Sequence, residues 1–85
     1  EQLHRADVRI GELNWLAAPP APGDEVRVQI RHRAPAVPAR VAACEPGAGG
    51  TVSLDFEQAQ RAVAPGQSAV IFRGDVVLGG GRIAA

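Results

Sequence analysis

Cysteine, lysine and tyrosine are nearly or entirely missing from this sequence, and so is any long hydrophobic run. The single cysteine, Cys44, has no partner for an internal disulfide, which excludes a disulfide-stapled secreted scaffold and favours a reducing compartment. No apolar stretch is long enough to cross a bilayer, and the first residues lack a signal-peptide pattern. We therefore expect a cytoplasmic protein with no membrane partner.

An excess of charge of one sign is also absent, because nine arginines balance nine acidic residues and no lysine occurs. Bulk electrostatics therefore predicts no particular partner. The 85 residues suffice for one small domain, residues 1–85, whose core must consist mainly of Val, Ile, Leu and Ala. Since the chain begins with Glu1 rather than Met, we expect a piece of a longer protein.

Catalytic and metal-binding patterns are scarce as well. Cys44 could pair with His4 or His32 as an activated nucleophile, but no Asn or Asp accompanies them in a recognisable motif. The Ala-Ala-Cys context favours a small packed residue instead. Because CxxC and HxxxH spacings are lacking, the sequence predicts no metal site and no catalytic residue.

The dominant pattern is a series of short alternating runs separated by turns rich in proline and glycine. Val26, Val28 and Ile30 alternate with polar residues, as in a strand with one buried face. Further strands are predicted at residues 5–10, 37–44, 52–57, 68–73 and 75–78, with residues 13–16 following a turn at Gly11. Residues 56–63 (FEQAQRAV) have room for one helical turn at most. The pattern predicts a small all-β barrel or sandwich.

Two turns flank the fifth predicted strand. The segment Pro65, Gly66 and Gln67 predicts a type II turn, with Pro at its first and Gly at its second central position. Gly74 separates residues 68–73 from residues 75–78 and predicts a hairpin between them.

A run of three glycines, Gly79, Gly80 and Gly81, follows the last predicted strand. With Ala84 it matches the GxGxxA spacing of a dinucleotide-binding loop. That loop requires a following helix, for which only Ala85 remains. We therefore interpret the glycines as a bulge, a barrel corner or a close backbone approach.

A row of polar residues follows one face of the strand that begins near Val26. Arg27, Gln29, Arg31 and Arg33 share the parity opposite to the apolar residues, so they project outward as donors of a kind that suits phosphate. The alternative is a solvated outer face whose charges are balanced by nearby carboxylates.

Taken together, several of these segments resemble the C-terminal part of the tRNA-specific 2-thiouridylase family. Residues 64–70 (APGQSAV), the turn at Gly74 and residues 77–81 (VLGGG) are similar to its C-terminal signature. Asn14-Trp15 resembles an Asn-Trp pair near the start of the family's last domain. The segment 31–33 (RHR) resembles an Arg-Tyr-Arg strand, with His in place of Tyr.

The resemblance implies a fold and a context. Family members sulfurate the wobble uridine of certain tRNAs, using an N-terminal domain that binds ATP with Mg²⁺ and a cysteine persulfide. Their C-terminal domain is a six-stranded antiparallel β-barrel, similar to the second domain of translation elongation factors. This chain has neither the family's SGGxDS loop nor its cysteine pair, so the resemblance implies the barrel alone, without cofactor or catalytic residues.

We therefore expect a barrel that helps to position tRNA for the catalytic part of the protein. The candidate RNA contacts are Arg27, Arg31, Arg33 and Arg82, with the backbone amides of the three glycines as further candidates. The alternative is a structural or protein-docking barrel that contacts other domains of the same chain, or a sulfur-carrier protein, without touching RNA.

Overall fold

The computed structural model describes residues 4–30, 34–47, 49–61 and 63–84. All regular structure in these ranges is β-strand. The six strands are β1 (His4–Trp15), β2 (Glu25–Gln29), β3 (Val37–Glu45), β4 (Thr51–Arg61), β5 (Ser68–Arg73) and β6 (Val76–Ile83).

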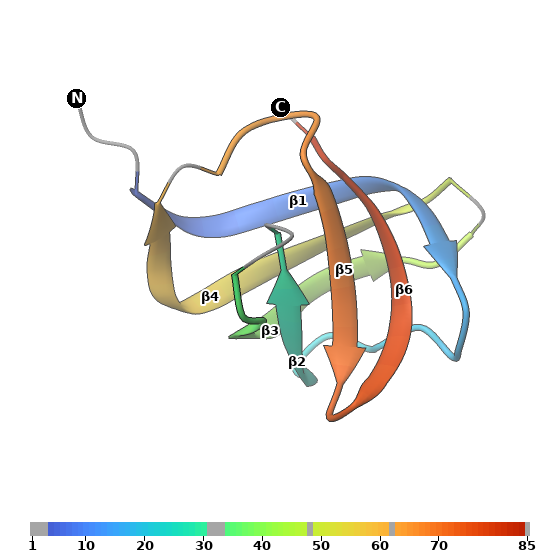
Figure 1. Cartoon of the computed structure of the whole chain (residues 1–85). Coiled ribbons are helices and arrows are strands. Elements are labelled where there is room, and N and C mark those ends of the chain that lie inside the picture. The colour runs from blue at the N-terminus through green and yellow to red at the C-terminus, as the bar shows by residue number, and fades with distance from the viewer. Residues whose placement is uncertain (1–3, 31–33, 48, 62, 85) are drawn as a thin grey trace.

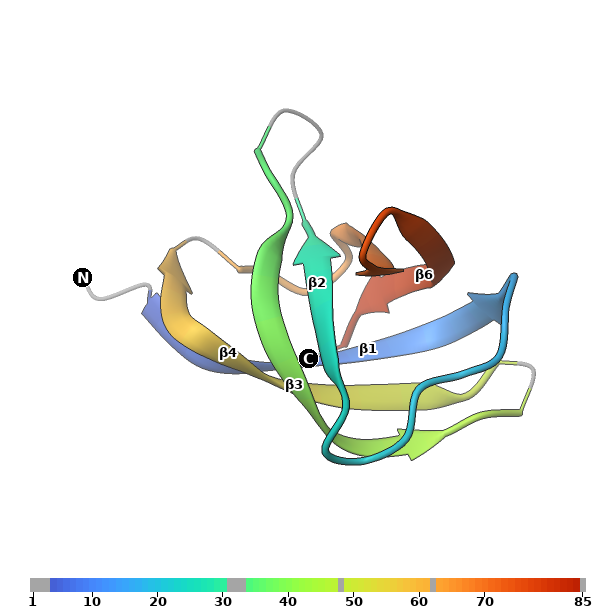
Figure 2. The same cartoon turned by 90° about the horizontal axis from the view of Figure 1, so that it is seen from below.

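The strands form one closed barrel in the order β1-β4-β3-β2-β5-β6, with every neighbouring pair antiparallel. This confirms the predicted six-stranded antiparallel barrel. Figures 1 and 2 show β1 and β4 as long curved strands that lie side by side, with the β5–β6 hairpin completing the ring. The hairpin turns at Gly74 and Asp75, as predicted, and Gly74 adopts a φ of 58°.

The barrel interior is filled by apolar side chains that alternate along the strands. On β2, Val26 and Val28 are buried while Glu25 and Arg27 are exposed, which confirms the predicted alternation. No charged or polar residue is buried among the described residues. The buried set is Val8, Ile10, Leu13, Val26, Val28, Ala39, Val41, Val52, Leu54, Phe56, Ala69, Ile71, Leu78 and Ile83.

The first strand contains a bulge where a turn was predicted. β1 continues through Gly11, and the turn expected there is wrong. Gly11 pairs with Arg82 and Asn14 with Gly80. Two residues of β1, Glu12 and Leu13, therefore stand opposite Gly81 alone, which is a β-bulge. Glu12 takes up the distortion with a φ of 52°. The extra residue shifts the alternation, so that Leu13 follows Val8 and Ile10 into the core.

The expectation of a helical turn within residues 56–63 is also wrong, because β4 extends to Arg61. Phe56 continues the inward series of Val52 and Leu54 and is only 7% exposed. Residues 56–59 of β4 stand opposite the single residue Ala6 of β1. The strand therefore bulges out of register with β1 here and does not form a helical turn. So short a segment gains little from helical hydrogen bonds, whereas the continuing strand regains partners on β1, where Gln60 pairs with Arg5 and Arg61 with His4.

The three glycines of β6 lie where β6 closes the ring against β1. A Cβ at Gly79 would lie 2.5 Å from the carbonyl oxygen of Asn14 and 2.8 Å from Cε3 of Trp15. A Cβ at Gly81 would collide with the carbonyl oxygen of Gly11. The two backbones therefore approach more closely than any side chain at these positions would permit.

This packing predicts that Gly79→Ala destabilises the barrel. The added methyl meets backbone atoms that cannot move aside, so the free energy of unfolding should fall by about 3 kcal/mol or more. Urea denaturation followed by intrinsic fluorescence measures the loss.

Gly47→Ala is the matched control, because a Cβ at Gly47 meets no atom within 4 Å. Its free energy of unfolding should stay within about 1 kcal/mol of the wild type. Equal stability of the two variants would contradict a steric role for Gly79.

Candidate nucleic-acid interface

The Pro65-Gly66-Gln67 segment forms a turn that is fastened to the end of β6. Gly66 has a φ of 89°, as the second central residue of a type II turn requires, and the N–H of Gln67 donates to the Ala64 carbonyl at 3.3 Å. The Gln67 side-chain oxygen accepts from the Ala64 N–H at 2.8 Å. Gly66 N–H donates to Ile83 O, and Ile83 N–H donates to Gln67 O, both at 2.8 Å. These bonds hold the turn beside β6, so the turn has a structural role and forms part of the surroundings of Arg82.

Arg82 projects from the outer surface of β6 next to this turn. Its Nη1 donates to the Gly66 carbonyl at 3.0 Å, and the side chain forms no ion pair among the described residues. The register places Arg9 of β1 diagonally across from it, at about 7–8 Å between backbones. Arg9 is exposed and likewise lacks an ion pair within the described ranges. Two uncompensated arginines therefore adjoin on this surface, and the sequence alone did not single out Arg9 because it depends on the β1–β6 register.

The neighbouring glycines offer little to an anion. β6 lies between β5 and β1, so the N–H groups of Gly79, Gly80 and Gly81 point into the ladders on either side. A phosphate cradle needs several N–H groups that converge on open solvent. The glycines thus do not fit a nucleotide-phosphate loop, and their geometry favours backbone packing.

Arg27 projects outward from β2 between Pro38 of β3 and Phe72 of β5. Its Nη2 donates to the Ala36 carbonyl at 3.2 Å, and it forms no ion pair within the described residues. A carbonyl orients the guanidinium but does not cancel its charge. Arg31 and Arg33 lie outside the described residues, so Arg27 is the one arginine of the predicted polar row whose position the structure describes.

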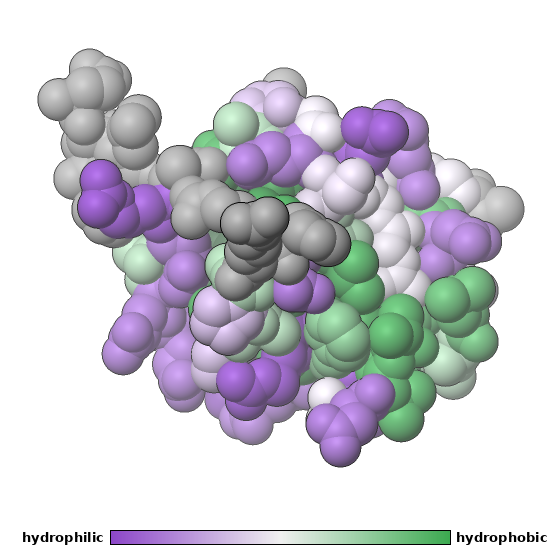
Figure 3. Space-filling model, in the orientation of Figure 1, coloured by the Kyte–Doolittle hydropathy of each residue, from purple (hydrophilic) through white to green (hydrophobic). Residues whose placement is uncertain are grey.

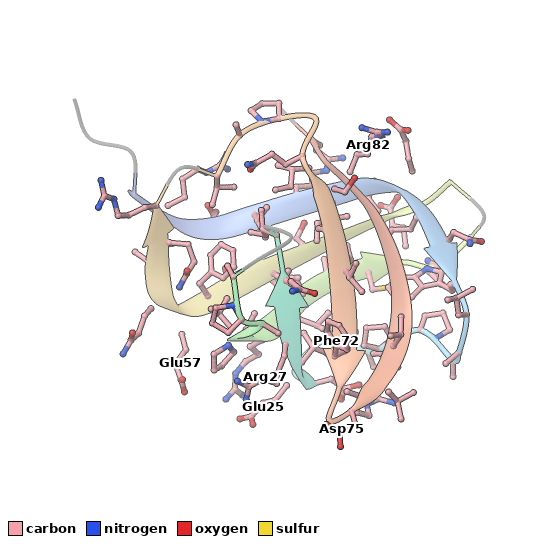
Figure 4. All side chains as sticks on the ribbon, in the orientation of Figure 1. Glu25, Arg27, Glu57, Phe72, Asp75 and Arg82 are labelled. Carbon is pink, nitrogen blue, oxygen red and sulfur yellow. The ribbon has the colours of Figure 1, made fainter. Side chains whose placement is uncertain are left out.

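The structure does not bring Arg27 and Arg82 together. Arg27 pairs with Phe72 of β5, whereas Arg82 pairs with Ser68 of the same strand. Four residues along a strand correspond to about 13 Å. Figure 4 shows Arg82 near one end of the barrel, with Arg27, Phe72 and Asp75 toward the other. An RNA would have to span both ends to meet both arginines.

An acidic row crosses four strands of the outer surface, and Glu25, Arg40 and Asp55 of this row line one cavity of about 590 Å³ with Arg27. Asp7 of β1 pairs with Asp55 of β4, Asp55 pairs with Arg40 of β3, and Arg40 pairs with Glu25 of β2. Arg40 forms an ion pair with Glu25 at 3.1 Å. Three carboxylates against one arginine make this row unfavourable for phosphate, so the side of Arg27 that faces Phe72 of β5 is the more favourable one for an anion.

A shallow cavity of about 420 Å³ lies beside Arg27. Its lining consists of Arg27, Ala36, Phe72, Gly74 and Asp75. Phe72 is half-buried and stands outside the core cluster. Alternation on β5 would have placed Phe72 outward, but only the β2–β5 register shows that it faces Arg27.

An exposed apolar patch, consisting of Leu16, Val76 and Val77, adjoins the β5–β6 turn. These side chains are 69%, 57% and 38% exposed. Leu16 lies beside β6 because its N–H donates to the Leu78 carbonyl at 2.8 Å. Figure 3 shows hydrophobic surface gathered over this part of β6 and the end of β1.

The Asn14-Trp15 pair lies at the end of β1, directly against β6. Trp15 pairs with Gly79 and packs on the core, and its indole Nε1–H is buried without a hydrogen-bond partner among the described groups. Gly79 leaves the space that the indole ring occupies. The pair therefore contributes to barrel closure.

Nothing among the described residues assembles a reactive centre. Cys44 is half-buried on β3 and packs against the core, and this burial raises the pKa of its thiol. The His32 side chain lies outside the described residues, and so does that of His4. No group of three or more His, Cys, Asp or Glu side chains in the described ranges is placed to hold a metal ion.

Within the same ranges no helix is long and apolar enough to span a membrane.

Comparison with known proteins agrees with the architecture. Residues 5–83 match the family model described as the aminomethyltransferase beta-barrel domain. A tRNA-specific 2-thiouridylase MnmA from Roseiflexus sp. (strain RS-1) is 59% identical over 84 residues, which cover 96% of this chain and 21% of the relative. The corresponding protein of Synechococcus sp. (strain WH7803) is 40% identical over 93 residues, covering 98% of this chain and 24% of the relative. That of Cupriavidus metallidurans is 43% identical over 82 residues, covering 95% and 22%.

The chain thus spans between a fifth and a quarter of the length of these curated relatives. Its match to the family model extends over almost all of its residues. The chain therefore belongs to the aminomethyltransferase β-barrel domain family, and its relatives there are tRNA-specific 2-thiouridylases that carry this barrel as their C-terminal domain.

Proposed function

We propose that this barrel is the non-catalytic C-terminal module of a tRNA 2-thiouridylase and helps to position tRNA for thiolation of the wobble uridine. The names of its relatives support the reaction, and the share of their length that the chain covers supports the restriction to one module. In this proposal ATP with Mg²⁺ and the sulfur-bearing cysteines belong to the remainder of the protein, which works in the cytoplasm.

The observation that carries the proposal is the state of the outward arginines. Arg9, Arg27 and Arg82 have no carboxylate partner among the described residues, whereas Arg5, Arg40 and Arg73 each form an ion pair. Uncompensated guanidinium groups suit phosphate oxygens. Such contacts fix the position of an RNA without reading its sequence, which is what a holding module requires.

A second function, protein docking, is favoured by the apolar patch of Leu16, Val76 and Val77. Aliphatic side chains gain free energy when a protein surface covers them, and they offer nothing to a phosphate backbone. Other domains of the same chain, or a sulfur-carrier protein, are the candidates for that surface. The two functions use different residues, so both can operate in one protein.

Positioning of tRNA through arginine predicts a salt-dependent affinity. Binding of tRNA to the chain, measured by fluorescence anisotropy over a range of KCl concentrations, should give a linear plot of log K against log salt. Arg27→Gln and Arg82→Gln should each reduce its slope by about 0.7–0.9, because each removes one phosphate contact. Arg31→Gln combined with Arg33→Gln should reduce it by about 1.4–1.8.

Arg40→Gln is the control, since it removes the same charge from the acidic row, where Arg40 already pairs with Glu25. It should leave the slope unchanged. Salt-independent binding by the wild type, or equal slopes for all variants, would refute RNA positioning.

The non-catalytic role predicts an unreactive Cys44. Burial favours the neutral thiol, so its pKa is raised and little thiolate exists at neutral pH. Alkylation by iodoacetamide should be slower in the folded chain than in urea, and its rise with pH should be shifted to higher pH in the folded chain. An alkylation midpoint at lower pH in the folded chain than in urea would point instead to an activated nucleophile.

A further inference from the structure

The cavity beside Arg27 brings together three kinds of side chain that a nucleotide can use. Phe72 supplies an aromatic ring, Arg27 a cationic donor and Asp75 an anionic acceptor, around a volume of about 420 Å³. Gly74 adds no side chain to the lining and leaves its Cβ position open. Figure 4 shows Phe72 and Arg27 at this end of the barrel, with Asp75 at the tip of the β5–β6 hairpin.

Phe72 is held on the outer surface by the fold itself. Its neighbours Ile71 and Arg73 are buried and exposed respectively, and the ring is half-buried beside the cavity rather than part of the core. Arg27 is its direct cross-strand partner. A β-ladder fixes the separation of such a pair, so the ring and the guanidinium are positioned together before any ligand arrives.

The two charged groups are available to a ligand. Arg27 donates one hydrogen bond to the Ala36 carbonyl at 3.2 Å, which orients its guanidinium. A guanidinium carries five N–H donors, so others remain for a ligand. Asp75 is exposed and forms no ion pair among the described residues. A ligand that satisfies both must carry an anionic group and a hydrogen-bond donor on either side of a flat apolar face.

We propose that this cavity binds one unpaired nucleotide of the tRNA. The base stacks on Phe72, its phosphate contacts Arg27, and an exocyclic amino group donates to Asp75. Bases within a duplex are stacked and paired on all sides, so only a loop or extruded nucleotide can enter. The carboxylate accepts from the amino group of cytosine and has no such donor to accept from on uracil. This subsite rests on the proposed function, to which it adds a binding location on the barrel and a preference for cytidine over uridine.

A protein ligand is the weaker alternative for this cavity. The nearby apolar patch of Leu16, Val76 and Val77 has the composition of a protein contact, yet none of its members lines the cavity. The cavity instead places a ring beside a guanidinium, and single-stranded nucleic acid is bound by aromatic rings in positively charged grooves.

The test measures binding of the chain to a fluorescent decamer of cytidine, to the same decamer hybridised with its complement, and to a decamer of uridine. The wild type should prefer the single cytidine strand. Phe72→Leu should weaken its binding roughly 5- to 150-fold without changing the salt slope, since the ring stacks but carries no charge. Phe72→Tyr keeps a ring and should retain the affinity. Arg27→Gln should reduce the slope by about 0.7.

Two further variants define the site. Asp75→Asn should abolish the preference for cytidine over uridine. Val76→Thr removes apolar surface next to the cavity but outside it, and should leave RNA binding unchanged. Phe72 lies outside the core, so circular dichroism should show all these variants folded.

The outcomes separate this subsite from the proposed function. If the wild type binds tRNA with a salt-dependent affinity but Phe72→Leu binds the cytidine strand as tightly as the wild type, the subsite is wrong and RNA positioning stands. Equal affinity for the single strand and the duplex also overturns the subsite. If the wild type binds neither tRNA nor the decamers, both proposals fail, and protein docking through this end of the barrel becomes the remaining function.

Discussion

Closure of the ring between β1 and β6 is the contact on which the rest of this barrel depends. The two backbones meet where Gly79 and Gly81 leave no side chain between them and where Glu12 absorbs one extra residue. That bulge turns Leu13 inward and seats Trp15 against Gly79. The hydrogen bonds of the Pro65-Gly66-Gln67 turn then secure the other end of β6. Without this approach the six strands would form an open sheet with a half-covered core.

The closed ring also distributes the surface chemistry. Alternation sends Val26 and Val28 inward and Arg27 outward, and the cross-strand register then decides what each outward residue meets. Arg27 meets Phe72, whereas Arg40 meets Glu25 and Asp55. The same residue type is therefore available to a ligand on one strand and neutralised on the next. A net charge of zero conceals this difference, because it arises from pairing and not from composition.

Much of the fold could be predicted from the sequence, since its strong signals are local. The alternation at Val26 and Val28 and the turns at Gly66 and Gly74 depend on neighbouring residues, and the structure contains each of them. The turn expected at Gly11 and the helical turn expected after Phe56 were wrong, because the choice between bending and continuing a strand is made by partners distant in the sequence. For the same reason the cavity beside Phe72, the acidic row and the adjacent Arg9 and Arg82 could not be read from the chain.

A closed ring of strands has no free edge. Each described strand has hydrogen-bonded neighbours on both sides over part of its length, so none of them offers a full-length edge to a strand of another chain. Recognition by backbone pairing along a whole strand, which many β-domains use to capture peptides, is therefore disfavoured in this one. A ligand of the barrel is then held chiefly by side chains and turns, and its specificity can change by surface substitution while the framework of strands stays as it is.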